Sequence, residues 1–258
     1  MKKPRHLLIT VLTILIPIGA SHSFASGSDI YYYFEDNNDP AMPTNSNESF
    51  YDIKYMGDTH QTTDQHKFGK GSMLIAEKKN QRDVNIGGLE GSAQGLDGEI
   101  HKMTITAWVR PAAVKNFTVL SRLPAVPGAF TLVYSSNNKC FYFQFVKSDG
   151  SRQSFASGKI PFIEPQEWMH AGLTFNEGKI MFYANGLPIG DADAAALGVT
   201  SISAAQGKQK FVMFNDLVPE SYVDDFGFLA DRALTEPEMD KVFNKGLEDF
   251  LKSPVPKK

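Results

Sequence analysis

His170 is the residue whose type could most readily do acid–base chemistry. An unperturbed imidazole titrates near neutrality, so a histidine beside a nucleophile or a carboxylate can act as a general base. No such partner is recognisable in the sequence around His170. It stands instead in an alternating run, in which Met169, Ala171 and Leu173 take one face of a strand and His170 takes the other. The pattern therefore predicts a structural histidine.

A second group of candidate ligands lies between Asp58 and His66. Two aspartates and two histidines fall within these nine residues, namely Asp58, His60, Asp64 and His66. Imidazole and carboxylate groups are ligands of zinc and related metals, so the run could bind such an ion. Its spacing matches no established ligand motif, and a polar loop between two strands accounts for the same residues. The sequence leaves both interpretations open.

Charge and cysteine content exclude several classes of protein. The 258 residues contain 26 Lys and Arg against 29 Asp and Glu, and the resulting net charge of −3 is unfavourable for binding nucleic acid. Cys140 is the only cysteine, so no intramolecular disulfide can form. We expect Cys140 to be buried as a small apolar residue, and the fold to depend on its hydrophobic core.

Residues 1–25 have the parts of a secretory signal peptide. Three basic residues among the first five precede an apolar run of 14 residues at 7–20, and small residues lead to Ala25. The run is shorter than the roughly 20 residues of a membrane-spanning helix. We therefore expect cleavage after Ala25 and a secreted or periplasmic protein with no membrane span in its mature chain. The remainder is predicted to form one domain at 26–250 and a flexible tail at 251–258.

Alternation of period two runs through the body of the chain and predicts an all-β sandwich. Strands are expected at 103–110, 117–123, 130–134, 140–147, 169–175, 179–184, 210–214 and 222–230. In the fourth of these, one face carries Phe141, Phe143 and Phe145, and the other carries Tyr142 and Gln144. We expect the three phenylalanines to build the core together with Trp108 and Trp168, because large aromatic side chains are mostly buried.

One helix is clearly predicted, around residues 236–249. Thr235 is a suitable N-cap, Glu238 completes a capping box, and Pro237 is tolerated in the first turn. Apolar residues then recur at helical spacing, at Met239, Val242, Phe243 and Leu247. This helix is expected to pack on the sandwich.

Taken in order, six short segments resemble a laminin-G-like jelly roll of the concanavalin A-like lectin/glucanase superfamily. They are Phe-Gly-Lys-Gly-Ser at 68–72, Thr-Ile-Thr-Ala-Trp-Val-Arg-Pro at 104–111, Trp-Met-His-Ala-Gly-Leu-Thr-Phe at 168–175, Phe-Tyr-Ala-Asn-Gly at 182–186, Tyr-Val-Asp-Asp-Phe-Gly at 222–227 and Arg-Ala-Leu-Thr-Glu-Pro-Glu-Met at 232–239. The resemblance covers about 68–247, and residues 29–35 are expected to supply the first strand.

The resemblance implies an antiparallel jelly-roll sandwich that acts as a non-catalytic binding module outside the cytoplasm, with carbohydrate as the expected ligand. Aromatic rings stack on the apolar face of a sugar ring, which makes Tyr31, Tyr33 and Tyr142 candidate ligand-binding residues. A protein-interaction or structural module of the envelope or extracellular matrix is the first alternative, with an extracellular or envelope protein as its partner. The second alternative is a glycan hydrolase or lyase with an unrecognised site.

The resemblance also implies a structural calcium ion, since sandwich modules of this kind often carry one at a sheet edge, bound by carboxylate and carbonyl oxygens. The candidate ligands are Asp224 and Asp225 in the last strand, with Glu35 or Asp36 from the first. Alternation places Asp224 and Asp225 on opposite faces, so both can point to one site only if the strand contains a bulge.

No catalytic residue is predicted. Glycosidases of this fold class need two carboxylates ~5–9 Å apart across a cleft. The alternating Glu and Asp run of the glucanases does not occur in the sequence, and Glu35 and Asp36 lead into a polar, Asn-rich loop. The resemblance in fold without the matching catalytic motif therefore favours binding over catalysis.

Overall fold

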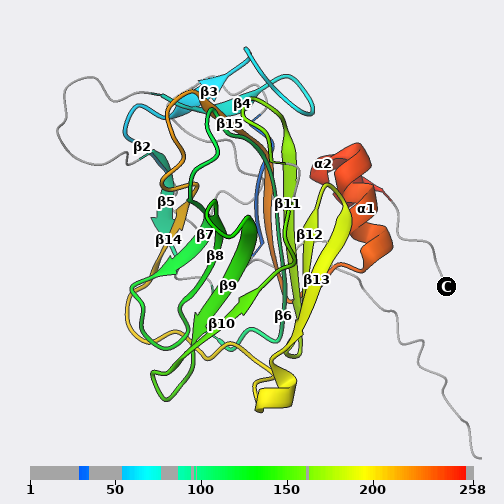
Figure 1. Ribbon diagram of the computed structural model, residues 1–258. Coiled ribbons are helices and arrows are strands. Elements are labelled where there is room, and N and C mark those ends of the chain that lie inside the picture. Colours follow the sequence, from blue (N-terminus) through cyan, green and yellow to red (C-terminus); the bar gives the residue numbers. More distant parts are fainter. Residues whose placement is uncertain are drawn as a thin grey trace, which may run out of the picture.

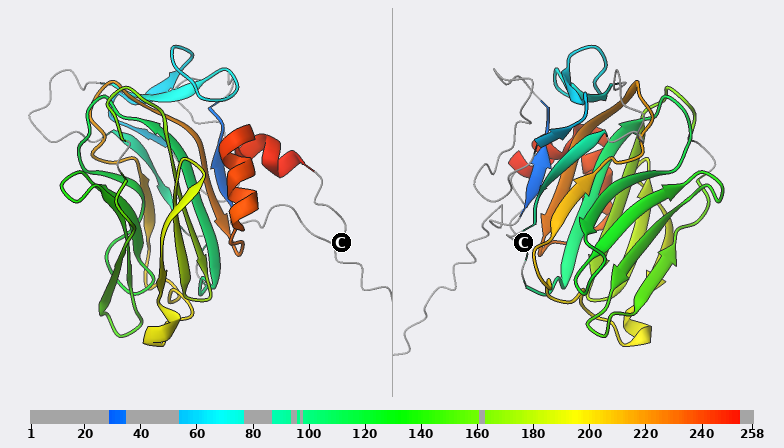
Figure 2. Two further views of the ribbon diagram at one scale, coloured as in Figure 1. Left: turned by 45° about the vertical axis from the view of Figure 1, so that its right-hand side comes forward. Right: turned by 90° about the vertical axis from the view of Figure 1, so that its left-hand side faces the viewer.

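The computed structural model describes residues 29–34, 54–76, 87–93, 96, 98–160 and 163–253. Its strands form two antiparallel sheets that pack face to face, as Figures 1 and 2 show. The predicted all-β jelly-roll sandwich is therefore confirmed. The predicted signal peptide, Glu35, Asp36 and residues 254–258 lie outside the described residues.

The first sheet has eight strands. In spatial order they are β13 (Leu187–Asp193), β12 (Lys179–Ala184), β11 (Met169–Asn176), β6 (Lys102–Arg110), β15 (Ser221–Ala230), β4 (Ser72–Ile75) and β3 (His60–Thr62), with β1 (Ile30–Tyr32) also paired to β15. The strand β15 holds this sheet together, because it pairs with β6 along one side and with β4 and then β1 along the other.

The second sheet has seven strands. They are β10 (Arg152–Ala156), β9 (Cys140–Val146), β8 (Phe130–Ser135), β7 (Phe117–Leu123), β14 (Lys210–Met213), β5 (Gly88–Ser92) and β2 (Lys54–Met56), in spatial order. A single 3₁₀ turn, η1 (Ala195–Leu197), follows β13.

Aromatic side chains fill the space between the sheets. Phe130 of one sheet stacks on Phe228 of the other with ring centroids 5.9 Å apart, and Phe145 meets the edge of Phe175 at 6.3 Å. Edge-on and offset contacts of this kind are favourable for aromatic pairs. Cys140 is buried and free, as expected. The core therefore stabilises the fold where a disulfide cannot.

Two helices cover the outer face of the eight-stranded sheet (Figure 2). The sequence had predicted a single helix around residues 236–249. They are α1 (Glu236–Lys245) and α2 (Leu247–Lys252), separated at Gly246. The predicted capping box is present, since the Glu238 carboxylate accepts hydrogen bonds from the backbone N–H and the hydroxyl of Thr235, each at 2.9 Å. Part of the segment predicted as a flexible tail is helical, because α2 extends to Lys252.

The helices pack closely because the strands beneath them carry glycine. A Cβ atom on Gly227 of β15 would lie only 2.3 Å from Leu247 Cδ2, and one on Gly172 of β11 would lie 3.2 Å from Met239 Sδ. Tyr31, Tyr183 and Leu229 complete the apolar cluster beneath the helices. Neither of the described helices has the length and apolar character needed to cross a membrane. Both described helices lie on this one side, so neither covers the outer face of the seven-stranded sheet.

Candidate functional site

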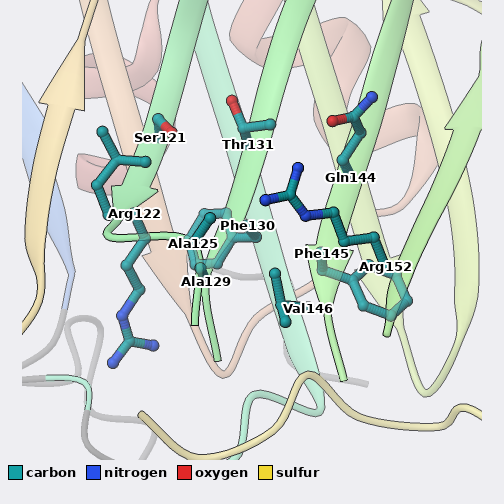
Figure 3. Close-up of a pocket in the computed structure, with 11 residues that line it drawn as sticks. Ser121, Arg122, Ala125, Ala129, Phe130, Thr131, Gln144, Phe145, Val146 and Arg152 are labelled. Carbon is teal, nitrogen blue, oxygen red and sulfur yellow. The ribbon is translucent and has the colours of Figure 1, made fainter. Parts of the chain in front are cut away.

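A hollow of about 430 Å³ lies on the seven-stranded sheet, near the end where β7 turns into β8 (Figure 3). Its lining comes from β7, β8, β9, β10 and the turn between β7 and β8. The hydrogen-bonding side chains around it include Ser121, Thr131, Gln144 and Arg152, and the apolar ones include Leu123, Ala125 and Val146. This mixture of polar and apolar groups is typical of ligand pockets.

The register of the sheet places three of the polar residues in one row. Ser121 pairs with Thr131, and Thr131 pairs with Gln144, so successive strands present these side chains on the same outer face. Gln144 also donates a hydrogen bond from Nε2 to Ser154 Oγ at 3.2 Å, which orients its amide. The row therefore offers both donors and acceptors at a surface that is otherwise apolar.

Arg122 supports the turn below this row. Its side chain is fully buried, and Figure 3 shows it pointing away from Ser121 and Thr131. The guanidinium donates hydrogen bonds to the backbone oxygens of Leu96 and Gly128, the latter at 3.5 Å. Gly128 has a φ of 88°, and a Cβ atom there would lie 2.8 Å from the backbone oxygen of Ser203, so the turn requires glycine.

The hollow lacks the groups that hydrolysis needs. Neither a carboxylate nor a histidine or cysteine is among the described residues that line it. A glycosidase requires two carboxylates, and a serine nucleophile such as Ser121 would require a base beside it. The geometry is therefore suited to holding a ligand by hydrogen bonds and apolar contact.

Of the three tyrosines predicted to bind ligand, Tyr142 alone lies on this face. It precedes Gln144 by two residues on β9, and its half-buried ring faces outward, with its hydroxyl accepting a hydrogen bond from Asn138 Nδ2 at 2.8 Å. Tyr31 belongs to β1 of the other sheet and is only 9% exposed beneath the C-terminal helices. Tyr33 lies beside Tyr31, with ring centroids 5.6 Å apart. The predicted tyrosines therefore do not form one site.

The sequence did not single out Ser121, Thr131 or Arg152 as ligand-binding residues. A signal for Arg152 was nevertheless present, because the turn at Asp149 and Gly150 sets the β9–β10 register and pairs Arg152 with Val146. That register places Arg152 on the same face as Gln144. Ser121 and Thr131 could be recognised only once the neighbouring strands were known.

The aromatic residues expected in the core are divided between three environments. Phe141, Phe143 and Phe145 are buried between the sheets, as predicted. Trp108 is also buried, but on the outer face of the eight-stranded sheet, where its ring stacks on Phe243 of α1 at 5.2 Å. Trp168 is half-buried, so its assignment to the core was wrong.

Asp224 and Asp225 are buried in β15 at a bulge. The register shifts between Asp224 and Gly227, and Asp225 adopts a φ of 48°, so strict alternation fails at this point. Asp224 Oδ2 accepts hydrogen bonds from the backbone N–H groups of Lys67 and Phe68 at 2.7 and 3.0 Å. Asp225 Oδ2 accepts one from the N–H of Leu247 at 2.6 Å, at the start of α2. The two carboxylates therefore anchor a loop and a helix.

Burial disfavours the charged forms of both aspartates. It raises the pKa of Asp224 well above its ordinary value and the pKa of Asp225 to about 7, although their backbone hydrogen bonds act in the opposite direction. The negative charges of Glu248 and Asp249, in the first turn of α2, further raise the pKa of Asp225.

The bulge brings both carboxylates to one hollow of about 520 Å³, together with Tyr33, Phe68, Glu248 and Asp249. Backbone N–H groups nevertheless occupy the carboxylate oxygens, and the part of the chain that the structure describes contains no group of three or more His, Cys, Asp or Glu able to hold a metal ion. Calcium takes six to eight oxygen ligands. The described residues therefore do not fit a calcium site, and calcium stays a prediction that depends on Glu35.

The predicted alternative of a zinc site at Asp58–His66 receives no support from the local geometry. His60 Nδ1 lies 2.9 Å from the backbone oxygen of Asp58, and Asp64 is held through its backbone N–H by the Thr62 hydroxyl at 3.2 Å. These local contacts are typical of a polar loop.

His170 is fully buried beside Trp108 and Phe243. Its Nε2 forms a hydrogen bond with Thr106 Oγ1 at 2.7 Å, while its Nδ1 has no partner within the described residues. Burial lowers the pKa of His170 to about 3, with a smaller contribution from the charge of Lys67. The ring is therefore neutral at physiological pH and shielded from any substrate.

We expect the His170 ring signals in a histidine NMR spectrum to stay unchanged between pH 8 and pH 5. The reason is that protonation would place a charge in a buried apolar site. Titration of His170 near pH 6.5 would contradict this placement.

Comparison with known proteins identifies a similar family for the part of the chain that contains the hollow. Residues 92–216 match a laminin-G family model described as the concanavalin A-like lectin/glucanases superfamily. This segment is therefore similar to that superfamily. The matched segment contains every residue that lines the hollow on the seven-stranded sheet, whereas Asp224, Asp225 and both helices lie beyond it.

Solved structures agree with the superfamily fold. The binding domain of botulinum neurotoxin serotype G has a TM-score of 0.57 at 12% identity, over 83% of this chain and 50% of that one. The binding domain of Paraclostridial Mosquitocidal Protein 1 has a TM-score of 0.61 at 11% identity, over 84% and 52%. The chain thus spans about half the length of these structures, and identities this low establish the fold alone. A search of curated proteins found no match.

Proposed function

We propose that this protein is an exported, non-catalytic module that binds carbohydrate at the hollow of the seven-stranded sheet. The observation that carries the proposal is a row of hydrogen-bonding side chains, Ser121, Thr131 and Gln144, set among apolar groups and without a carboxylate. Sugar hydroxyls both donate and accept hydrogen bonds, and the C–H face of a sugar ring packs on apolar atoms. The lining meets both needs.

Tyr142 extends this surface along β9. Its half-buried ring faces outward one step beyond Gln144, and Val133 of β8 pairs with it on the same face. An aromatic ring beside a row of hydrogen-bonding groups is a suitable platform for a second sugar residue. The proposed ligand is therefore longer than a monosaccharide.

Two similar structures support a carbohydrate ligand. One is the binding domain of botulinum neurotoxin DC in complex with SialylT, at 14% identity, and another concerns the dependence of botulinum neurotoxin type C on two ganglioside molecules, at 15%. A third is a complex with rat synaptotagmin II, also at 15% identity. Structures with this fold thus include some that bind carbohydrate and one that binds a protein. Binding of a protein partner is therefore the competing function.

A glycan array probed with residues 26–258 tests the proposal. We expect binding to a related set of glycans, and loss of that binding in Gln144→Ala because the amide lies in the polar row. Gln153→Ala is the matched control, since Gln153 pairs with Phe145 and so belongs to the opposite face of the sheet. An array that stays silent for the wild-type protein would favour a protein partner.

The same array, run once in calcium and once in chelator, tests the calcium prediction. Loss of glycan binding in chelator would require a calcium site that includes residues beyond the described ones, such as Glu35. Equal binding in both buffers would remove calcium from the proposed mechanism of binding. The carbohydrate proposal itself is tested by the comparison of the wild-type protein with Gln144→Ala, whatever the effect of calcium.

A further inference from the structure

Arg152 is the one exposed charged side chain among the described residues that line the hollow. It begins β10, one of the two edge strands of the sheet, and its pairing with Val146 directs its side chain to the outer face. In Figure 3 this side chain extends from β10 across the hollow, in the direction of Gln144 and Thr131. A cation therefore lies over a hollow whose other polar groups, apart from the buried Arg122, are neutral.

The charge of Arg152 is not neutralised within the part of the chain that the structure describes. The ion pairs found there join other residues, the nearest in sequence being Lys147 with Asp149 at 3.5 Å. Arg122, the other arginine of the lining, is occupied by the carbonyl oxygens of Leu96 and Gly128 and points away. Arg152 thus has donors available to a ligand.

A guanidinium has a particular preference among ligand groups. Its planar fork of N–H donors matches the two oxygens of a carboxylate, and the resulting charge-assisted pair is stronger than a hydrogen bond to a neutral hydroxyl. Thr131 and Gln144 also line the hollow and can form further hydrogen bonds with the same ligand. The arrangement is therefore more complementary to an acidic sugar than to a neutral one.

We propose that the hollow selects a saccharide that carries a carboxylate, with the Arg152 guanidinium pairing with that group while Ser121, Thr131 and Gln144 bind the neutral part of the sugar. This inference rests on the carbohydrate-binding function proposed above. The ligand is a glycan with an isolated acidic residue, and not a long polyanion, because a single exposed cation lines the hollow and the chain has a net charge of −3.

The test is an array of matched pairs, in which each carboxylated glycan stands beside its methyl ester or its neutral parent. We expect wild-type protein to bind the carboxylated member about 10- to 100-fold more tightly. Arg152→Gln should abolish this preference while leaving the weaker binding of the neutral member. Arg152→Lys should retain part of the preference, since it keeps the charge and loses the fork. The preference should also weaken at high salt, because the pair is exposed.

Lys210→Gln is the matched control. Lys210 belongs to β14 of the same sheet and pairs with Glu90 at 2.6 Å, outside the lining of the hollow, so its removal changes net charge equally. We expect it to leave the preference unchanged. If it weakens binding as much as Arg152→Gln does, the effect is one of net charge and the assignment to Arg152 is wrong.

Two further outcomes separate the inference from the function on which it rests. Equal binding of both members of each pair, lost in Gln144→Ala, overturns the acidic ligand and leaves carbohydrate binding in place. A preference for the carboxylate that survives Arg152→Gln places the anion elsewhere on the protein. Failure to bind any glycan overturns both proposals.

Discussion

Trp108→Ala is expected to lower the free energy of unfolding by ~3–5 kcal/mol, the usual cost of truncating a buried tryptophan. Its ring is 2% exposed and contacts three separate parts of the chain. It stacks on Phe243 of α1, meets the edge of Phe68 at 5.9 Å, and lies 5.3 Å from His170. Lys67 Nζ lies 4.2 Å from the centre of one of its rings, a cation–π contact. Removal therefore loosens helix, loop and sheet together.

Chemical denaturation measures this loss, and Trp168→Ala is the matched control. Trp168 is half-buried, so the same substitution there should cost less. A second readout is specific to the site: without the indole, water reaches His170, and the pKa of His170 should rise from about 3 toward its ordinary value. Equal losses in the two variants, with His170 still untitrated, would contradict the central role given to Trp108.

The free energy of unfolding of the Asp225→Asn variant is expected to increase relative to that of the wild type as pH rises. Burial raises the pKa of Asp225 from 3.8 to about 7, so between these values the native state holds a proton that the unfolded chain has released. The contribution of Asp225 to the free energy of unfolding therefore falls as pH rises through this window. Asparagine stays neutral, and its side-chain oxygen can still accept the hydrogen bond from Leu247.

The expected change in relative stability between pH 5 and pH 8 is ~2–3 kcal/mol, at ~1.4 kcal/mol per pKa unit. A comparison of the two proteins is needed, because His170 acts in the opposite sense: its lowered pKa makes stability rise with pH between about 3 and 6.5. That contribution is common to both proteins and cancels. Asp231→Asn, at an exposed aspartate just after β15, is the control for removing one carboxylate outside the buried pair. A pH-independent difference for Asp225→Asn would mean that Asp225 is ionised in the folded state throughout.

Local patterns in the sequence predicted much of this fold. The alternation from 140 to 146 assigned Phe143 to the core and Gln144 to the surface, because side chains in a strand alternate regardless of what surrounds it. The capping box of Thr235 and Glu238 located the start of α1, since it requires only four consecutive residues. Features that depend on neighbours along the chain are therefore readable from the sequence.

Features that depend on neighbours across the sheet were not readable in this way. Trp108 lies on the outer face of its strand and is buried only because α1, more than a hundred residues later, packs over it. The bulge at Asp225 reflects the register between β15 and β6, which no local pattern marks. The hollow likewise depends on four adjacent strands, so Ser121 and Thr131 carried no signal of their own.

The position of β15 within its sheet also governs when the protein can fold. This strand joins β6 to β4 and β1, yet it follows all three in the chain, and the helices that cover it come later still. During synthesis, the two halves of the eight-stranded sheet therefore have no shared partner until residue 230 has been made. Folding of the sandwich must be a late event that joins distant parts of the chain, and pairings of such long range make folding slow.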